Sequence, residues 1–186
     1  MTSIRHTESA PDAPYLDAAR ESILAVGWRR TTLTDVARRA GVSRMTIYRR
    51  WPDMQSLLAD LLVREWGSHF TGALDGGLAQ GAATVVRRLR EDALFRRIVE
   101  VDPELLLPYL LDRRGRNQDR LLELLTTALE DGQRKGTVRD GEPALMARTL
   151  LLALQGFVVS HRTMADVPVD ALDREMTELV ERYLAP

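Results

Sequence analysis

The chain has 186 residues, of which 45% are apolar, and its formal net charge is −1 at pH 7. This length fits a small domain joined to a larger one, and the apolar content is enough to fill a core, so a disordered chain is excluded. Because Cys is absent, disulfide frameworks and thiolate sites are excluded as well, which fits a reducing cytoplasm.

The charge is divided unevenly along the chain. Residues 1–55 contain nine Arg against six acidic residues, a surplus of three positive charges, whereas residues 56–186 carry a net charge of −4. A basic surplus of this size indicates that one copy would bind nucleic acid weakly, so specific binding would need two copies side by side. The longest uncharged apolar run, residues 149–160, is too short to span a bilayer, and no secretory signal pattern follows Met1.

The N-terminal residues predict a disordered arm followed by one helix. Residues 1–13 are polar and lack periodicity, and their few basic residues are offset by acidic ones, so an arm that enters the minor groove is the weaker interpretation. A helix is predicted from Pro14 to about Val26, with an end at Gly27. Its apolar positions are Leu16, Ala19, Ile23 and Val26.

The segment 32–51, TLTDVARRAGVSRMTIYRRW, predicts two short helices joined by a tight turn. Thr32 can cap the first helix, and Asp35 stands where the acid of a capping box belongs. Gly41 follows where that helix must end, since a left-handed residue is cheapest without a Cβ, and Ser43 can cap the second helix. Two helices joined this closely must cross steeply, as in a helix-turn-helix.

The second of these helices has one apolar and one polar face. Ile47 and Trp51 lie four residues apart and can pack on Val36, Ala37 and Ala40 of the first helix. The opposite face offers arginines, a hydroxyl, a phenol and an apolar side chain, a mixture suited to phosphates, guanine edges and thymine methyls. The candidate DNA-contacting residues are Thr32, Thr34, Ser43, Arg44, Met45, Thr46, Tyr48, Arg49 and Arg50.

The pattern T-x-x-D-V-A-x-x-A-G-V-S-x-x-T-I-Y-x-x-W, preceded by Gly27-Trp28 and followed by Pro52, resembles the DNA-binding domain of the TetR family of bacterial transcriptional regulators. The resemblance covers roughly the first third of the chain. It implies an all-α protein with a helix-turn-helix domain at residues 14–52 and a helical domain for ligand binding and dimerisation at 53–186. It also implies a repressor that leaves its palindromic operator when a small inducer binds.

Two positions depart from the family pattern. Met45 stands where the family often has Gly, and Met54 stands where the next helix usually begins with Lys. Because the second change removes an expected phosphate contact, the anchoring charge is predicted to come from Arg49 and Arg50.

The larger part of the chain predicts further helices and no strand, since no stretch alternates with period two. Asp53 can cap a long helix that runs towards Phe70 and belongs to both domains, so its tilt would move the second helix of the motif. After the glycines of residues 72–81, one helix is predicted over 84–101. Its expected inward residues are Val85, Leu89, Ala93 and Ile98, and its expected solvated arginines are Arg87, Arg88, Arg90, Arg96 and Arg97.

A buried helix is predicted from Pro103, because apolar side chains surround it on all sides, and Pro108 should kink or break it. The remaining helices are predicted at residues 120–133, with Leu121, Leu124, Leu125 and Leu129 on one stripe, at 143–164 and at 169–184.

The helix from Pro143 has two apolar faces and therefore needs two partners. One face, with Met146, Leu150, Leu154 and Phe157, can pack on its own domain, and the other can pack on a second copy. Together with the last helix it would form a four-helix bundle, which resembles the TetR-family dimer interface. The candidate interface residues are Leu152, Gly156, Val159, Leu172, Met176, Leu179 and Tyr183.

A ligand pocket is expected between the helix after Asp53, the helix around Pro108 and the helix from Pro143. The aromatic residues that could line it are Phe95, Tyr109 and Phe157, although each is as compatible with an ordinary core. Apolar walls favour a hydrophobic inducer, and Arg113 or His161 could meet a polar end.

The sequence carries no convincing catalytic or metal-binding pattern, so neither an enzyme nor a cofactor is predicted. His6, His69 and His161 lie far apart and lack partners at metal-ligand spacing. The principal alternative is an all-helical protein interaction module with a vestigial helix-turn-helix. The arginines at 44, 49 and 50 argue against it, because a helix that no longer touched DNA would not need them. A small helical enzyme is a second, weaker alternative.

Overall fold

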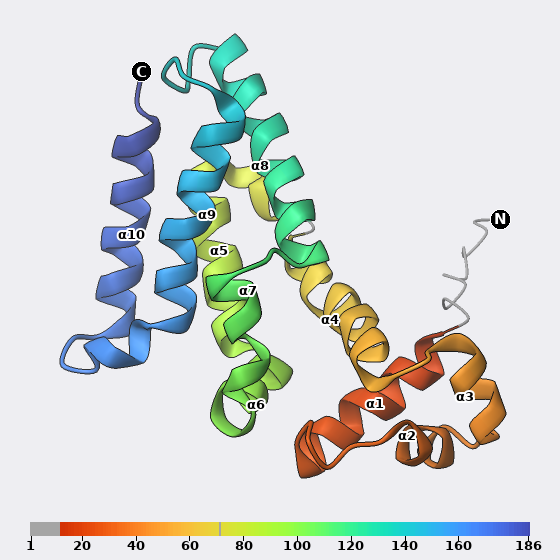
Figure 1. Cartoon of the computed structure of the whole chain (residues 1–186). Coiled ribbons are helices and arrows are strands. Elements are labelled where there is room, and N and C mark those ends of the chain that lie inside the picture. The colour runs from red at the N-terminus through yellow and green to blue at the C-terminus, as the bar shows by residue number, and fades with distance from the viewer. Residues whose placement is uncertain (1–11, 71) are drawn as a thin grey trace, which may run out of the picture.

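The computed structural model describes residues 12–70 and 72–186, and the regular structure of these residues is helical (Figure 1). This confirms the predicted all-α class. No helix in this part of the chain is long and apolar enough to cross a membrane. The α-helices are α1 (Ala13–Val26), α2 (Leu33–Arg39), α3 (Arg44–Arg50), α4 (Met54–Phe70), α5 (Leu78–Glu91), α6 (Ala93–Val101), α7 (Leu107–Leu111), α8 (Arg116–Arg134), α9 (Pro143–Val159) and α10 (Val169–Leu184).

Local hydrogen bonds set the ends of α2 and α3. The Thr32 hydroxyl accepts from the Asp35 N–H at 3.2 Å, and the Asp35 carboxylate accepts from the Thr32 N–H at 3.2 Å, so the predicted capping box is confirmed. The Ser43 hydroxyl accepts from the Thr46 N–H at 3.2 Å and caps α3. Between the two helices Gly41 has φ +70°, a conformation that favours a residue without Cβ.

The core around the helix-turn-helix extends beyond residue 52. Ile47 of α3 and Trp51, which follows it, are buried together with Leu57 and Leu61 of α4, and Ile98 of α6 closes the same cluster. As predicted, Asp53 caps α4 by accepting from the Ser56 N–H at 2.7 Å. Helix α4 therefore joins two cores, because its second half packs on α5 and α8 of the larger domain (Figure 1).

The larger domain is a bundle of roughly aligned helices. Helix α5 packs on α9 and α10, and α8 packs on α4 and α9 (Figure 1). Its core is apolar and comes from sequence segments far apart, which is what fixes the bundle. The fully or nearly fully buried members include Val86, Leu125, Leu129, Met146, Ala147, Met176 and Val180.

The single helix predicted over residues 84–101 is wrong, because the chain breaks at Asp92. Asp92 is extended, with ψ 125°, and its carboxylate accepts from the Phe95 N–H at 2.7 Å, so it caps a new helix instead of continuing the old one. Helix α5 also begins earlier than predicted, at Leu78. Ala93, expected to face inward, is exposed at the start of α6.

The buried helix predicted from Pro103 is also wrong. Pro103–Leu105 form a short 3-10 turn and α7 is a separate five-residue helix, since Pro108 sits in its first turn and interrupts the ladder. The side chains of α7 are exposed or half-buried, and Leu111 is 80% exposed. Two boundaries shift as well: α8 begins at Arg116, and α9 ends at Val159, before a 3-10 turn.

Arg90, predicted to be solvated, is buried. Its guanidinium binds the Asp173 carboxylate, so this ion pair ties α5 to α10 inside the larger domain. Removing one partner of such a pair leaves the other charge buried without compensation.

We expect Asp173→Ala to lower the free energy of unfolding by about 3 kcal/mol, because it strands the Arg90 charge. Asp170→Ala on the same helix is the matched control, since the side chains of Asp170 and Arg174 are 70% and 72% exposed and their pair contributes little to stability. Urea unfolding measures both. Equal losses in the two variants would contradict a structural role for the Arg90–Asp173 pair.

Candidate nucleic-acid interface and internal cavity

Helix α3 exposes the face that its sequence predicts. Met45 is 71% exposed and Tyr48 is 48% exposed, and Arg44 and Arg49 are also exposed, whereas Ile47 is fully buried on the opposite side. Within the described residues Arg44 and Arg49 have no ion-pair partner. Their charges are therefore available to a polyanion.

The hydroxyl residues around this face already have local partners. Thr32 donates its hydroxyl to Asp35 at 2.6 Å, and the hydroxyl oxygens of Ser43 and Thr46 lie 3.0 Å apart. The hydrogen bond from Thr32 holds the pKa of Asp35 below its usual value, so this capping acid stays charged. Thr34 is half-buried. These residues position the ends of α2 and α3 and still lie beside the exposed face.

Arg50 is held by a carboxylate that the sequence analysis assigned to the N-terminal arm. Its Nε donates to both oxygens of Asp12 at 2.9 Å, and its Nη2 donates to Asp12 Oδ2 at 2.5 Å. These hydrogen bonds raise the pKa of Arg50 further. Residues 1–11 of the expected arm lie outside the described residues, whereas Ala13 already belongs to α1, which shortens that arm. Of the two predicted anchoring arginines, only Arg49 lacks an ion-pair partner among residues 12–70 and 72–186.

A second carboxylate joins the end of α3 to the larger domain. Trp51 Nε1 donates to Asp60 Oδ2 at 2.8 Å, and Arg116 Nη2 donates to Asp60 Oδ1 at 2.6 Å. Partial burial raises the pKa of Asp60, but the hydrogen bonds from Trp51 and Arg116 outweigh it, so the pKa lies below its ordinary value. Asp60 is therefore an anion that accepts from one residue of each domain.

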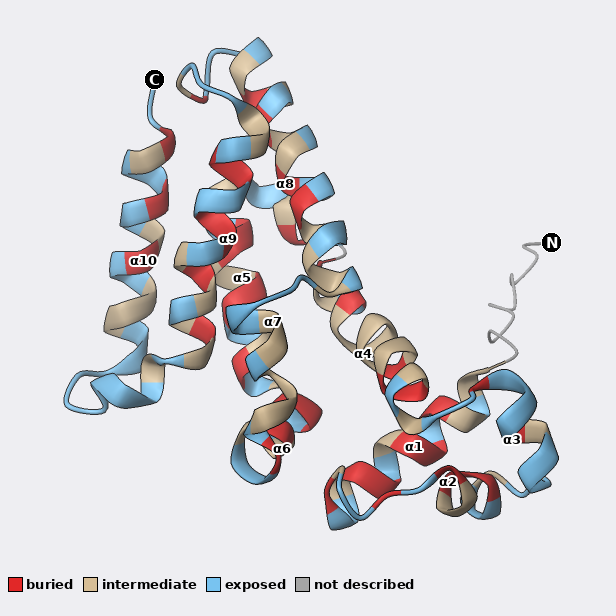
Figure 2. Ribbon diagram, viewed as in Figure 1, coloured by how far each residue is buried: buried red, intermediate tan, exposed pale blue. Residues whose placement is uncertain are grey.

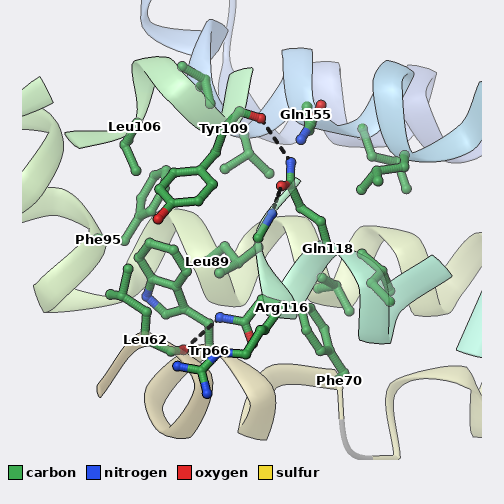
Figure 3. A pocket seen from close by; sticks show the side chains of 18 of the residues that line it. Leu62, Trp66, Phe70, Leu89, Phe95, Leu106, Tyr109, Arg116, Gln118 and Gln155 are labelled. Atoms are coloured by element: carbon green, nitrogen blue, oxygen red, sulfur yellow. Dashed lines mark hydrogen bonds between the residues drawn. The ribbon is translucent and has the colours of Figure 1, made fainter. Parts of the chain in front are cut away.

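A cavity of about 180 Å³ lies inside the larger domain, between α4, α5, α6, α7, α8 and α9 (Figure 3). Its walls are mostly aliphatic and aromatic. Trp66 and Phe95 meet edge to face there, with ring centroids 5.5 Å apart. The lining residues include Leu62, Val63, Trp66, Phe70, Val86, Leu89, Phe95, Leu106, Tyr109, Leu121, Leu151, Leu154 and Val158.

The polar residues of the cavity come mainly from the first turn of α8. Gln118 Nε2 donates to the Tyr109 carbonyl at 3.1 Å, and Asn117 Nδ2 donates to the Leu62 carbonyl at 2.7 Å (Figure 3). The second bond fixes the orientation of the Asn117 amide, since only its nitrogen can donate. Asn117 Oδ1 is buried, and it lacks a hydrogen-bond partner among the described residues. Arg116 and Gln155 complete the polar set.

Two of the three aromatic residues predicted for a ligand pocket line this cavity, and their binding of a ligand stays a prediction. Phe95 and Tyr109 line it, whereas Phe157 packs against the core outside the lining. Arg113 and His161, which were predicted to meet a polar end of the ligand, are not among the lining residues. The Arg113 guanidinium lies 5.2 Å from the centroid of the Tyr109 ring, and His161 Nδ1 lies within hydrogen-bond distance of the Val158 carbonyl. Trp66 and Phe70 were missed as lining residues, because they continue an apolar stripe that reads as ordinary core. The available signal in the sequence was that apolar residues occupy more than one face of α4, so that some of them can line a cavity.

On the expected interface helices α9 and α10, exposed and buried residues alternate (Figure 2), and several of the exposed residues are apolar. Leu152 is 70% exposed and Leu179 is 49% exposed, and a Cβ added at Gly156 would meet no atom within 4 Å. Leu172, Val159 and Tyr183 are half-buried. Met176 is a correction: its side chain is fully buried in its own core, so it cannot offer surface to a second copy.

Comparison with known proteins decides the family. Residues 16–61 match the model of the bacterial regulatory proteins of the tetR family. An uncharacterised HTH-type transcriptional regulator of Mycobacterium bovis is 35% identical over 195 residues, which cover 99% of this chain and 100% of that protein. The chain belongs to the TetR family. It is a DNA-binding transcriptional regulator and not an enzyme, and the helix-turn-helix is its DNA-binding element.

Two further relatives share parts of this likeness. The HTH-type regulator AlkX of Mycobacterium tuberculosis is 47% identical over 55 residues, 26% of this chain. The structure of the TetR family repressor AlkX from Dietzia sp. has a TM-score of 0.69 and 22% identity, and the match covers 96% of this chain and 97% of that one. At that identity the second likeness supports the TetR fold alone.

The Asp12–Arg50 pair gives a prediction with a definite sign for this regulator. We expect Asp12→Asn to raise DNA affinity on all sequences and to steepen the salt dependence by about one ion, because Arg50 becomes free to bind a phosphate. Arg50→Ala should lower affinity uniformly. Fluorescence anisotropy with duplex DNA at several salt concentrations measures both effects.

Glu21→Gln is the control, since it removes one acid from an exposed pair with Arg39 outside α3. If Glu21→Gln raises DNA affinity as much as Asp12→Asn does, the effect comes from the net charge of the protein and not from the release of Arg50. A decrease in affinity for Asp12→Asn would show that Asp12 orients Arg50 and does not compete for it.

Proposed function

We propose that this regulator is a homodimeric repressor that binds a palindromic operator through α3 and releases it when an apolar ligand enters the cavity. The exposed face of α3 carries the proposal, because its unpaired arginines, aromatic ring and methionine serve no core. Such a regulator would act in the cytoplasm, where the chromosome lies. An interaction module with a vestigial motif would have no use for this face.

Within this proposal each residue of the face has a distinct task. Arg44, in the first turn of α3, can fork onto guanine, and Met45 can contact a thymine methyl. Arg49 contacts phosphate, and Tyr48 and Thr46 offer hydroxyl groups to phosphates or base edges. Thr32 and Thr34 lie at the start of α2 and Ser43 at the start of α3, where their hydroxyl groups can contact backbone phosphates. Met54 is half-buried against the core and adds no charge.

The exposed stripe on α9 and α10 supports dimerisation. Leu145, Leu152 and Leu179 would otherwise expose apolar surface to water, and Gly156 leaves room for close approach of a second helix. Pairing both helices with their copies forms a four-helix bundle. A two-fold dimer then presents two α3 helices, which can read half-sites about 34 Å apart.

The cavity supports an apolar ligand with an uncharged polar end. Its aliphatic and aromatic walls favour hydrocarbon, and the side-chain amide of Gln155, another lining residue, can bond a hydroxyl group (Figure 3). Arg116 is its charged lining residue and already binds Asp60, so a carboxylate would lack a free cation. The similar repressor from Dietzia sp. is described as implicated in biodegradation of n-alkanes, which is compatible with a hydrocarbon chain.

Selection of bound sites from random duplex DNA tests the operator and the dimer together. The recovered sites should form a palindrome, and Leu152→Glu should give monomers that lose tight binding to it, because an unpaired charge cannot be buried in an apolar bundle. Leu111→Glu is the control, since Leu111 is 80% exposed on α7, away from this stripe. Analytical ultracentrifugation gives the oligomeric state. A dimeric Leu152→Glu would move the interface elsewhere, and failure to recover any site would reject the operator.

The cavity assignment is tested with 1-decanol and decanoate as probes. We expect 1-decanol to bind more tightly, and Val63→Phe to weaken it about ten-fold, because the added ring atoms occupy a cavity of about 180 Å³. Trp66 lines the cavity and reports binding by fluorescence. Phe157→Leu is the control, because Phe157 lies outside the lining. Equal weakening in both variants, or tighter binding of decanoate, would refute the proposed ligand site.

A further inference from the structure

We propose that Asp60 couples the cavity to the recognition helix, because it accepts hydrogen bonds from Trp51 at the end of α3 and from Arg116 in the cavity wall. Its role in ligand response rests on the proposed function. Its role in holding α3 does not, since both hydrogen bonds are present in the structure and neither involves a ligand.

On the DNA-binding side, Asp60 holds a residue with little freedom. Trp51 is 2% exposed and is the residue at which α3 ends. Tyr15 of α1 packs edge to face against its ring at 5.9 Å, and the Arg50 guanidinium lies 5.6 Å from the ring centroid. Any shift of the Trp51 indole therefore moves the last turn of α3 together with Arg50.

On the cavity side, Asp60 holds a residue that a ligand would touch. Arg116 is the first residue of α8 and lines the cavity, where its side chain lies beside Leu62 and Trp66 (Figure 3). The same turn of α8 is fixed by Asn117 and Gln118, whose amides bond α4 and α7. A ligand that seats its polar end against this turn would displace the Arg116 side chain from Asp60.

The strength of these contacts suits a switch. The Arg116 and Asp60 side chains are 59% and 33% exposed, so water can replace their ion pair at modest cost. The Trp51 bond lies deeper, since Trp51 is 2% exposed. Ligand entry can thus break one bond of Asp60 and leave the carboxylate to reorient with Trp51, which shifts the population of α3 orientations.

A second polar link between the domains does not reach the cavity. The Asp102 carboxylate accepts from the Trp28 N–H at 2.8 Å, but Asp102 and Trp28 are outside the residues that line the cavity. Asp60 has a cavity residue on one side and a recognition-helix residue on the other.

The first test uses full-length protein without ligand. Arg116→Ala should move the NMR signal of the Trp51 indole N–H, identified with Trp51→Phe, and should weaken binding to the selected duplex about two- to five-fold. Arg114→Ala is the matched control, because it removes the same charge from the same end of α8 but breaks an exposed pair with Asp119. It should leave both readouts unchanged.

A double-mutant cycle separates coupling from a general loss of charge. Asp60→Asn keeps an acceptor for Trp51 but no longer attracts Arg116, so the double variant Asp60→Asn/Arg116→Ala should bind DNA no more weakly than Asp60→Asn alone. Arg116→Lys should restore at least half of the lost affinity. Additive losses, or an Arg116→Ala variant that behaves like Arg114→Ala in both readouts, would overturn the proposal.

A titration with 1-decanol tests the ligand-dependent part. In the natural protein it should move the Trp51 indole signal, and in Asp60→Asn it should still quench Trp66 without moving that signal. If 1-decanol quenches Trp66 and moves the Trp51 indole signal by the same amount in both proteins, coupling through Asp60 is refuted. If 1-decanol does not bind, the ligand class of the proposed function fails, whereas the ligand-free cycle still decides whether Asp60 holds α3.

Discussion

The structure depends on the burial of one helix in two cores. Leu57 and Leu61, in the first half of α4, lie beneath the helix-turn-helix. Phe70, the last residue of α4, is buried in the larger domain. Trp66, between them, packs against the core of each domain. Because a buried helix cannot slide without opening cavities, a displacement of α4 at the cavity wall is transmitted to the core beneath α3. A regulator needs this property, since a change at a ligand site has to reach DNA over the length of α4.

Acidic residues form ion pairs with arginines at two places that matter for function. Asp12 and Asp60 together engage Arg50 and Arg116, and each does so across a boundary between elements. The result is a DNA-binding face on which a few arginines lack ion-pair partners among the described residues, which fits the proposed binding as a dimer. The same pairing gives the cavity wall a charged residue that is already neutralised, which favours uncharged ligands.

The cavity is bordered by two breaks in the helical chain. Asp92 ends α5 and caps α6, and Pro108 lies in the first turn of the five-residue helix α7, so short segments line this part of the cavity instead of one continuous helix. The apolar side chains of Leu106 and Tyr109 reach that space from a segment with few buried contacts of its own. A segment held so lightly can adjust to a ligand at low cost, unlike the interdigitated core around Met176.

The sequence by itself determined the elements whose signals are local. Caps at Thr32, Ser43 and Asp53, the left-handed Gly41 and the alternation of buried and exposed residues on α3 depend on neighbours within a few residues, so the helix-turn-helix and its family could be predicted. Tertiary structure alone decided that Arg90 and Met176 are buried, that Phe157 stays outside the cavity and that Asp12 and Asp60 bind Arg50 and Arg116. These outcomes join residues tens of positions apart, and the periodicity of one helix specifies which side is apolar but not which partner covers it.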